Sequence, residues 1–176
     1  MKIIIIADNL VNDYCSFQSH FTSKNVNIGR QTIEKIIGIE EDFGKGPLPT
    51  FLKAQKLISN TQLVFFRDNY DLDTPVHQEY LERLGEHCIH GTIGADFIDP
   101  LEDLAEESVI FDCAGHSFPF DAFRKFITEH TGVDITHSER PTPSEEVRFL
   151  LVGFHTERRI FSAANSNFHF IVIFFY

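Results

Sequence analysis

The first residues of the chain constrain its fold more than any other segment. Residues 2–7 read KIIIIA, and after Lys2 they form a continuous apolar run that ends at Asp8. A run without polar alternation is typical of a strand buried on both faces, as in a parallel sheet covered by helices. Four similar runs follow, at residues 63–66, 108–111, 147–152 and 170–175.

Helical patterns separate these runs. Helices are expected over residues 50–59, 75–84, 121–130 and 156–165. In the first of these, the spacing puts Phe51, Ala54, Leu57 and Ile58 on one face. Strands that alternate with helices predict an α/β fold, here a three-layer α/β/α sandwich with a central, mainly parallel sheet of about five strands.

The length indicates one domain over residues 1–176. Folding a chain of this size buries about 70% of its extended surface, so a sizeable core is available without disulfides. Residues 16–46 are the least regular part, and we interpret them as an elaborated surface connection with a helix near 32–39. The chain ends directly after its last strand, so we expect either an exposed edge strand or cover from a second copy in a homo-oligomer.

The charge and the cysteine content of the chain restrict the functions that it can have. The 26 acidic and 15 basic residues give a net charge of −11, which disfavours binding to nucleic acid and to anionic membranes. Three cysteines without paired spacing are typical of reduced thiols in a cytoplasmic protein. The apolar runs at both ends of the chain are too short to span a bilayer.

Polar residues stand where the predicted strands end. Ligands of parallel α/β sheets bind at the carboxyl ends of the strands. The residues expected there are Asp8 and Asn9, Arg67 and Asp68, Asp112 and Cys113, and Gly153. The acids are compatible with a ligand site, and equally with caps for the helices that follow.

Four segments together resemble a known superfamily. They are IIIIADNLVNDYC (3–15), FFRDNYD (65–71), HCIHGTIGADFIDPL (87–101) and VGFHTERRIFSAA (152–164). Their content and order resemble the isochorismatase-like and nicotinamidase-related cysteine hydrolases, over most of the chain outside residues 16–46. The resemblance implies the isochorismatase-like fold and hydrolysis of a small carboxamide such as nicotinamide.

The resemblance also implies an Asp–Lys–Cys triad, in which a cysteine thiolate attacks the amide and forms a thioester. Backbone N–H groups beside a cis peptide would hold the oxyanion, and that peptide maps to Phe154 and His155. The nucleophile position, however, is Arg159, and the lysine position is Asp112, with Phe111 as its neighbouring alternative. The aspartate position is Asp8, or Asn9 if the opening motif is aligned without a gap.

Two interpretations of these substitutions remain open. Arg159 could lie between Asp8 and Asp112 in a structural ion network. Alternatively, Arg159 could recognise an anionic ligand in the same pocket.

A divalent metal such as zinc, iron or manganese is the one cofactor that the resemblance suggests. The metal-binding aspartate maps to Asp68 and one histidine to His87, whereas a second histidine position is Tyr70. One carboxylate and one imidazole are few ligands for zinc, and neither His77 nor His90 is placed by the motif. The alternative is that His87 is a structural histidine.

We therefore carry two functional hypotheses. The first is a non-catalytic homologue that binds a small molecule after loss of the thiolate mechanism. The second is an active hydrolase that uses Cys113, with His116 nearby in sequence, or a water bound to a metal at Asp68 and His87. A sequence that has decayed or shifted frame near its end is a third interpretation.

Overall fold

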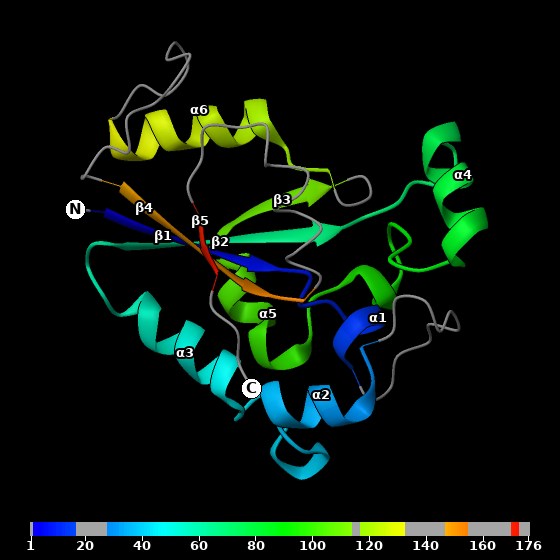
Figure 1. Cartoon of the computed structure of the whole chain (residues 1–176), viewed down its shortest axis with the longest axis horizontal. Helices are drawn as coiled ribbons and strands as arrows, with labels where there is room; N and C mark the ends of the chain where they lie inside the picture. Colours follow the sequence, from blue (N-terminus) through cyan, green and yellow to red (C-terminus); the bar gives the residue numbers. More distant parts are fainter. Residues whose placement is uncertain (1, 17–27, 114–116, 133–146, 155–169, 173–176) are drawn as a thin grey trace.

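The computed structural model describes residues 2–16, 28–113, 117–132, 147–154 and 170–172 (Figure 1). Its centre is one five-stranded sheet in the order β3-β2-β1-β4-β5, and every neighbouring pair is parallel. The strands are β1 (Lys2–Asp8), β2 (Thr61–Asp68), β3 (Val109–Cys113), β4 (Val147–Gly153) and β5 (Phe170–Val172). The predicted α/β fold with a parallel sheet is confirmed.

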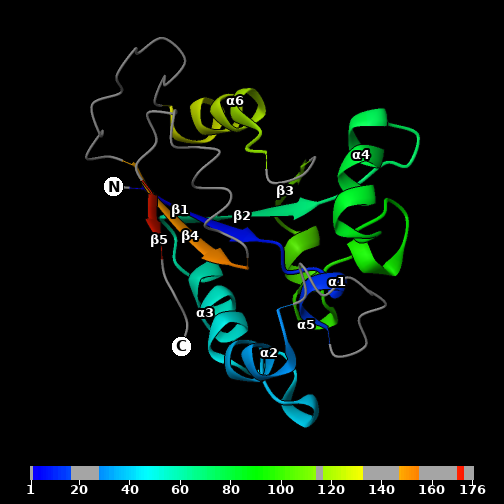
Figure 2. The same ribbon diagram turned by 45° about the vertical axis from the view of Figure 1, so that its right-hand side comes forward.

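Helices cover both faces of the sheet. One face carries α6 (Phe120–Thr131), and α2 (Arg30–Ile36), α3 (Pro47–Lys56) and α5 (Asp99–Glu106) lie on the other side (Figures 1 and 2). The α4 helix (Pro75–Leu84) stands beyond the carboxyl end of β2, and the single-turn helix α1 (Asn12–Cys15) packs beside the η2 turn (Ile93–Ala95). Two short 3-10 turns complete the described elements, η1 (Glu40–Asp42) and η2 (Ile93–Ala95). The molecule therefore has the expected three layers.

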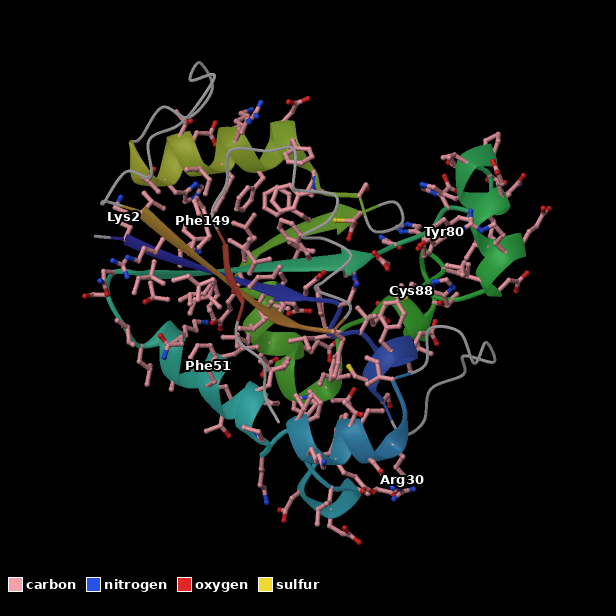
Figure 3. The ribbon with its side chains drawn as sticks, in the orientation of Figure 1. Lys2, Arg30, Phe51, Tyr80, Cys88 and Phe149 are labelled. Atoms are coloured by element: carbon pink, nitrogen blue, oxygen red, sulfur yellow. The ribbon has the colours of Figure 1, made fainter. Side chains whose placement is uncertain are left out.

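The buried side chains of β1 alternate between two cores. Ile5 and Ala7 belong to the core on the side of α2, α3 and α5, whereas Ile4 and Ile6 face the core under α6. This alternation follows from the two-residue period of a strand, and it explains why the run contains no polar residue. Figure 3 shows the side chains of both layers, with Phe51 on α3 and Phe149 on the α6 side of the sheet.

The chain has 19 phenylalanine residues, and among the described residues seven of them lie in or against the core under α6. The rings of Phe66, Phe111, Phe118 and Phe123 contact one another at centroid distances of 5.2–5.9 Å, mostly edge to face. Aromatic pairs in this geometry add to the stabilisation that comes from burial alone.

Two elements differ from the sequence prediction. The α3 helix begins at Pro47 and ends at Lys56, so its buried face consists of Leu48, Pro49 and Leu52. Leu57 falls in the turn after the helix and is 87% exposed. Proline is favoured in the first turn of a helix, which explains the start at Pro47. The buried face passes through Leu48 and Leu52, so it is rotated from the expected face of Phe51 and Ala54. The third strand extends to Cys113, so Asp112 lies inside it.

Other expectations fall partly outside the described residues. The helix expected near 32–39 is present as α2 over Arg30–Ile36, whereas the helix expected over 156–165 lies outside the described residues. The α5 helix was not predicted. Within the described parts of the chain, no helix has the length and apolar content needed to cross a membrane.

Candidate functional site

The carboxyl ends of β1 and β4 are held tightly together. Asp8 is the last residue of β1 and is fully buried. Its carbonyl oxygen accepts a hydrogen bond from the Phe154 N–H at 3.0 Å. Gly153, opposite Asp8, has φ +126°, and a Cβ built there would lie 2.1 Å from the same oxygen. Only glycine fits this contact, because the backbone of β1 occupies the space of a side chain.

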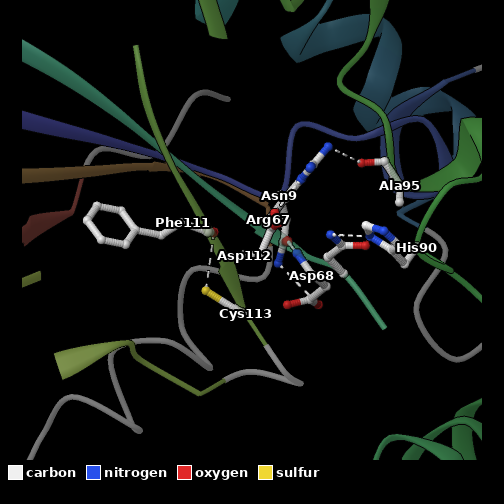
Figure 4. A network of polar contacts seen from close by, with 9 residues as sticks. Asn9, Arg67, Asp68, His90, Ala95, Phe111, Asp112 and Cys113 are labelled. Atoms are coloured by element: carbon white, nitrogen blue, oxygen red, sulfur yellow. Dashed lines mark hydrogen bonds and ion pairs between the residues drawn. The ribbon is translucent and has the colours of Figure 1, made fainter. Parts of the chain in front are cut away.

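Asn9 joins the ends of β1 and β2. It has φ +53°, in the left-handed region that asparagine tolerates better than most residues. Its Oδ1 accepts the backbone N–H of Asp68 at 2.8 Å, and its Nδ2 donates to Asp68 Oδ2 at 3.5 Å (Figure 4). The Asn9 side chain is therefore directed at β2, whereas Asp8 is the residue that ends the strand.

The Asp68 carboxylate is a buried hydrogen-bond acceptor. Tyr14 of α1 donates its hydroxyl to Asp68 Oδ2 at 2.6 Å, in the buried interior. Burial first, and the Asp68 charge second, raise the pKa of the Tyr14 hydroxyl well above its ordinary value. The hydroxyl consequently keeps its proton and remains a donor at neutral pH.

Asp112 forms an ion pair with Arg67, a partner that the sequence pattern does not predict. Arg67 is its cross-strand neighbour on β2, and the Nε–Oδ1 distance is 2.6 Å. Arg67 also donates to the Ala95 carbonyl at 3.2 Å (Figure 4). Its guanidinium carbon lies 5.3 Å from the centroid of the Phe97 ring. The Asp112 side chain is 49% exposed. This ion pair arises because Asp112 lies within the extended β3, where strand register places it beside Arg67.

Other implied site positions are described only in part. Phe154 is buried and follows β4, and its N–H group donates a hydrogen bond to the Asp8 carbonyl. The Phe154–His155 peptide bond and Arg159 lie outside the described residues. The expected ion network of Arg159 with Asp8 and Asp112 therefore remains a prediction.

The residues around Asp68 and His87 do not fit a zinc site. His87 is buried, and because a carbonyl can only accept, its Nδ1 must donate to the Gly85 oxygen at 2.6 Å. Tyr70 is also buried, and its ring meets the His87 ring at 5.0 Å. Throughout the described ranges, no group of three or more His, Cys, Asp or Glu side chains is arranged to hold a metal ion. Asp68 and His87 alone provide fewer protein ligands than zinc takes.

The other two candidate histidines serve local contacts. The Asp71 N–H donates to His77 Nδ1 at 2.9 Å, and the Asn69 side-chain nitrogen lies 3.2 Å from His90 Nδ1. Both contacts are exposed and lie in the segment that leads from β2 into α4 and its neighbouring loop. These contacts hold the His77 and His90 rings against backbone and side-chain groups of the adjacent segment.

All three cysteines of the sequence are buried. Burial raises the pKa of the Cys15 and Cys88 thiols above the ordinary value, and for Cys88 the Asp68 and Asp13 charges add to this effect. Cys113 lies in the phenylalanine-rich core, with its Sγ 3.5 Å from the Phe111 carbonyl (Figure 4). His116, its expected partner, lies outside the described residues.

Two polar residues of α1, Asn12 and Asp13, hold the neighbouring loops in place, a role that no motif in the sequence indicates. Asp13 accepts the Cys88 N–H at 2.7 Å and so fixes the segment that carries His87. Asn12 donates to the carbonyls of Ile93 and Asp96 at 3.0 and 3.2 Å. The available signal was the cluster of polar residues immediately after an apolar strand, because buried polar side chains require partners.

Comparison with known proteins places this geometry in a known fold. No protein-family model and no curated protein sequence matches the chain. Among solved structures, it is similar to the nicotinamidase/pyrazinamidase of Bacillus subtilis, with 18% identity, 98% of this chain and 84% of that chain covered, and a TM-score of 0.66.

Two further structures agree with this match. The pyrazinamidase of Pyrococcus horikoshii in complex with zinc has 18% identity over 98% of this chain and 83% of that chain, with a TM-score of 0.62. An isochorismatase-like hydrolase from Alkaliphilus metalliredigens has 17% identity over 98% and 79% of the two chains, with a TM-score of 0.59. The resemblance seen in the sequence is thus confirmed at the level of the fold: this chain has the isochorismatase-like hydrolase fold.

Proposed function

We propose that this protein is a non-catalytic member of the isochorismatase-like hydrolases that binds a small molecule and lacks the thiolate mechanism. The observation that carries the proposal is the burial of all three cysteines. A nucleophilic cysteine needs an accessible, electropositive surrounding that lowers its thiol pKa. For Cys15 and Cys88 the pKa is raised instead.

The substitutions at the triad positions support the same proposal. In the alignment that the resemblance implies, Asp8 retains the carboxylate, but the lysine position holds Asp112, which is paired with Arg67. The nucleophile position holds Arg159, which cannot form a thioester. Carboxylates without the ammonium group do not stabilise a thiolate, because like charges raise each other's pKa.

The nature of the ligand is suggested by the similar structures. They are nicotinamidases and pyrazinamidases, whose substrates are small aromatic carboxamides. We therefore propose a small aromatic carboxamide or the corresponding acid as ligand, bound at the carboxyl ends of β1, β2 and β4. The competing proposal is an active hydrolase, with Cys113 as nucleophile or with a metal-bound water at Asp68 and His87. Its support is the zinc-bound Pyrococcus structure.

The first experiment measures ammonia release. Purified protein is incubated with nicotinamide and pyrazinamide, with and without added zinc or manganese. We expect no release above a protein-free blank, together with a ligand-dependent rise in melting temperature. Release that a Cys113→Ala variant lacks would establish the relocated thiol route. Release that a chelator abolishes would establish the metal route, and either result would overturn the proposal.

A second experiment tests the thiols directly. Native protein and protein unfolded in guanidinium are treated with iodoacetamide, and labelling is followed by mass spectrometry. We expect all three thiols to react readily only after unfolding, because a buried neutral thiol is a poor nucleophile. Rapid labelling of a single cysteine in the native protein would contradict the reasoning.

A further inference from the structure

Tyr70 occupies a position where the family resemblance implies a metal-binding histidine, and its ring is the centre of an aromatic cluster. The Tyr70 ring meets His87 at 5.0 Å and His77 at 5.7 Å, both edge to face. It stacks on Tyr80 at 5.6 Å with an interplanar angle of 20°. These contacts join the end of β2, the α4 helix and the loop that carries His87.

The backbone of Tyr70 is fixed to the same loop. Its N–H donates to the Cys88 carbonyl at 2.8 Å, and its carbonyl accepts the His90 N–H at 2.8 Å. Tyr70 and Ile89 form a parallel β-bridge. The ring and the peptide of Tyr70 therefore both bind the loop to the end of β2.

Tyr14 extends this arrangement to α1. Its ring lies 5.7 Å from the His87 ring, and its hydroxyl donates to Asp68 Oδ2 at 2.6 Å. A cation that used this oxygen would have to displace a buried, charge-assisted hydrogen bond. The two residues that could serve as metal ligands, Asp68 and His87, are thus already joined through Tyr14.

We propose that this cluster, formed by Tyr14, Tyr70, Tyr80, His77 and His87 with the Asp68 carboxylate, replaces a metal ion as the cross-link at the carboxyl end of β2. A bound metal stabilises a fold by joining ligands from separate segments. Here aromatic packing and the Tyr14–Asp68 hydrogen bond join the same segments. The helix α4 depends on this cluster, because Leu81 is its one buried side chain and Tyr80 packs directly on Tyr70. The protein therefore folds and keeps its stability without a divalent ion.

The test is the metal content and thermal stability of the wild-type protein. Protein is dialysed against zinc, separated from free ion and analysed by mass spectrometry for metal. Thermal unfolding is followed with EDTA and with excess zinc. We expect metal far below one equivalent and the same melting temperature in both conditions. A specific site at saturating zinc would raise the melting temperature by about 5–10 °C. Such a rise, with one equivalent of metal lost in Asp68→Asn, would overturn the proposal.

Two variants test the cluster itself. Tyr14→Phe removes only the hydroxyl that bonds Asp68, and we expect its melting temperature to fall by about 3–9 °C. Tyr80→Phe is the control at the half-buried rim of the cluster, where we expect a shift below about 2 °C. Equal shifts in the two variants would contradict the role of Tyr14.

The double variant Tyr14→Phe/Tyr70→His tests the replacement in the reverse direction. It frees the Asp68 carboxylate and supplies a second imidazole beside His87, so we expect a zinc-dependent rise in melting temperature that the wild type lacks. These measurements do not depend on ammonia release, so the two proposals can fail separately.

Discussion

Replacing Gly153 by alanine tests the contact that closes the candidate site. A Cβ at this position would lie 2.1 Å from the Asp8 carbonyl oxygen and 2.8 Å from the Asp8 nitrogen. These are backbone atoms of the central strand, so they cannot move aside as a flexible side chain would. β1 and β4 would have to separate where the Phe154 N–H bonds to Asp8.

The cost can be worked from two contributions. A φ of +126° lies outside the conformations that residues with a Cβ adopt readily, and such strain costs about 1–3 kcal/mol. Separation of the strands loses the Phe154–Asp8 hydrogen bond, which contributes about 1 kcal/mol, and loosens the buried contacts around it. We expect Gly153→Ala to lower the free energy of unfolding by about 2–4 kcal/mol, a large part of the stability of a typical domain.

The assay is equilibrium unfolding in urea, followed by far-ultraviolet circular dichroism. Gly132→Ala is the matched control: Gly132 has φ +72°, and nothing lies within 4 Å of a Cβ built there. That variant should lose only the conformational term, about 1 kcal/mol. If the two variants differ by less than about 1 kcal/mol, with equal denaturant slopes, the steric reasoning is refuted.

Two further predictions concern the core and its pH dependence. Leu52→Ala should lower the free energy of unfolding in urea by about 2–5 kcal/mol, because Leu52 is buried. Leu57→Ala should lower it by less than about 0.5 kcal/mol, because that side chain is 87% exposed. Similar losses in the two variants would contradict the observed buried face of α3. The pKa values of the Cys15 and Cys88 thiols in the folded protein are raised above 9.0. The free energy of unfolding therefore keeps its full value below that pH, and it falls at higher pH as the thiols of the unfolded chain ionise. Above pH 9, each thiol should lower the free energy of unfolding by about 1.4 kcal/mol per pH unit. The slope of this free energy against pH should therefore decrease in Cys15→Ala. An unchanged slope in that variant would contradict the assignment.

The sequence was sufficient for the layers and for the edge of the sheet at which the candidate residues lie. A continuous run of β-branched residues can be buried on both faces only in a covered sheet, so residues 2–7 predict the central parallel strand. Once the strands are known to be parallel, their carboxyl ends must meet at one edge. The strand pattern therefore suffices to place Asp8 and Asp68 together.

The partners of these residues could not be predicted in the same way. Asp112 pairs with Arg67 because β3 extends two residues further than its apolar run and takes its register from β2. The face of α3 depends on where Pro47 starts the helix and on which side meets the sheet. Neither the Asp112–Arg67 ion pair nor the buried face of α3 can be predicted from a local sequence pattern.

The sequence by itself determined the α/β architecture and the edge of the sheet at which polar groups gather. Only the tertiary structure decided that all three cysteines are buried and that Tyr14 bonds Asp68 across 54 residues of chain. The physical reason is that burial periodicity is a local property of a strand or helix. Hydrogen bonds, ring contacts and pKa values depend on which distant segments the fold brings within a few ångströms.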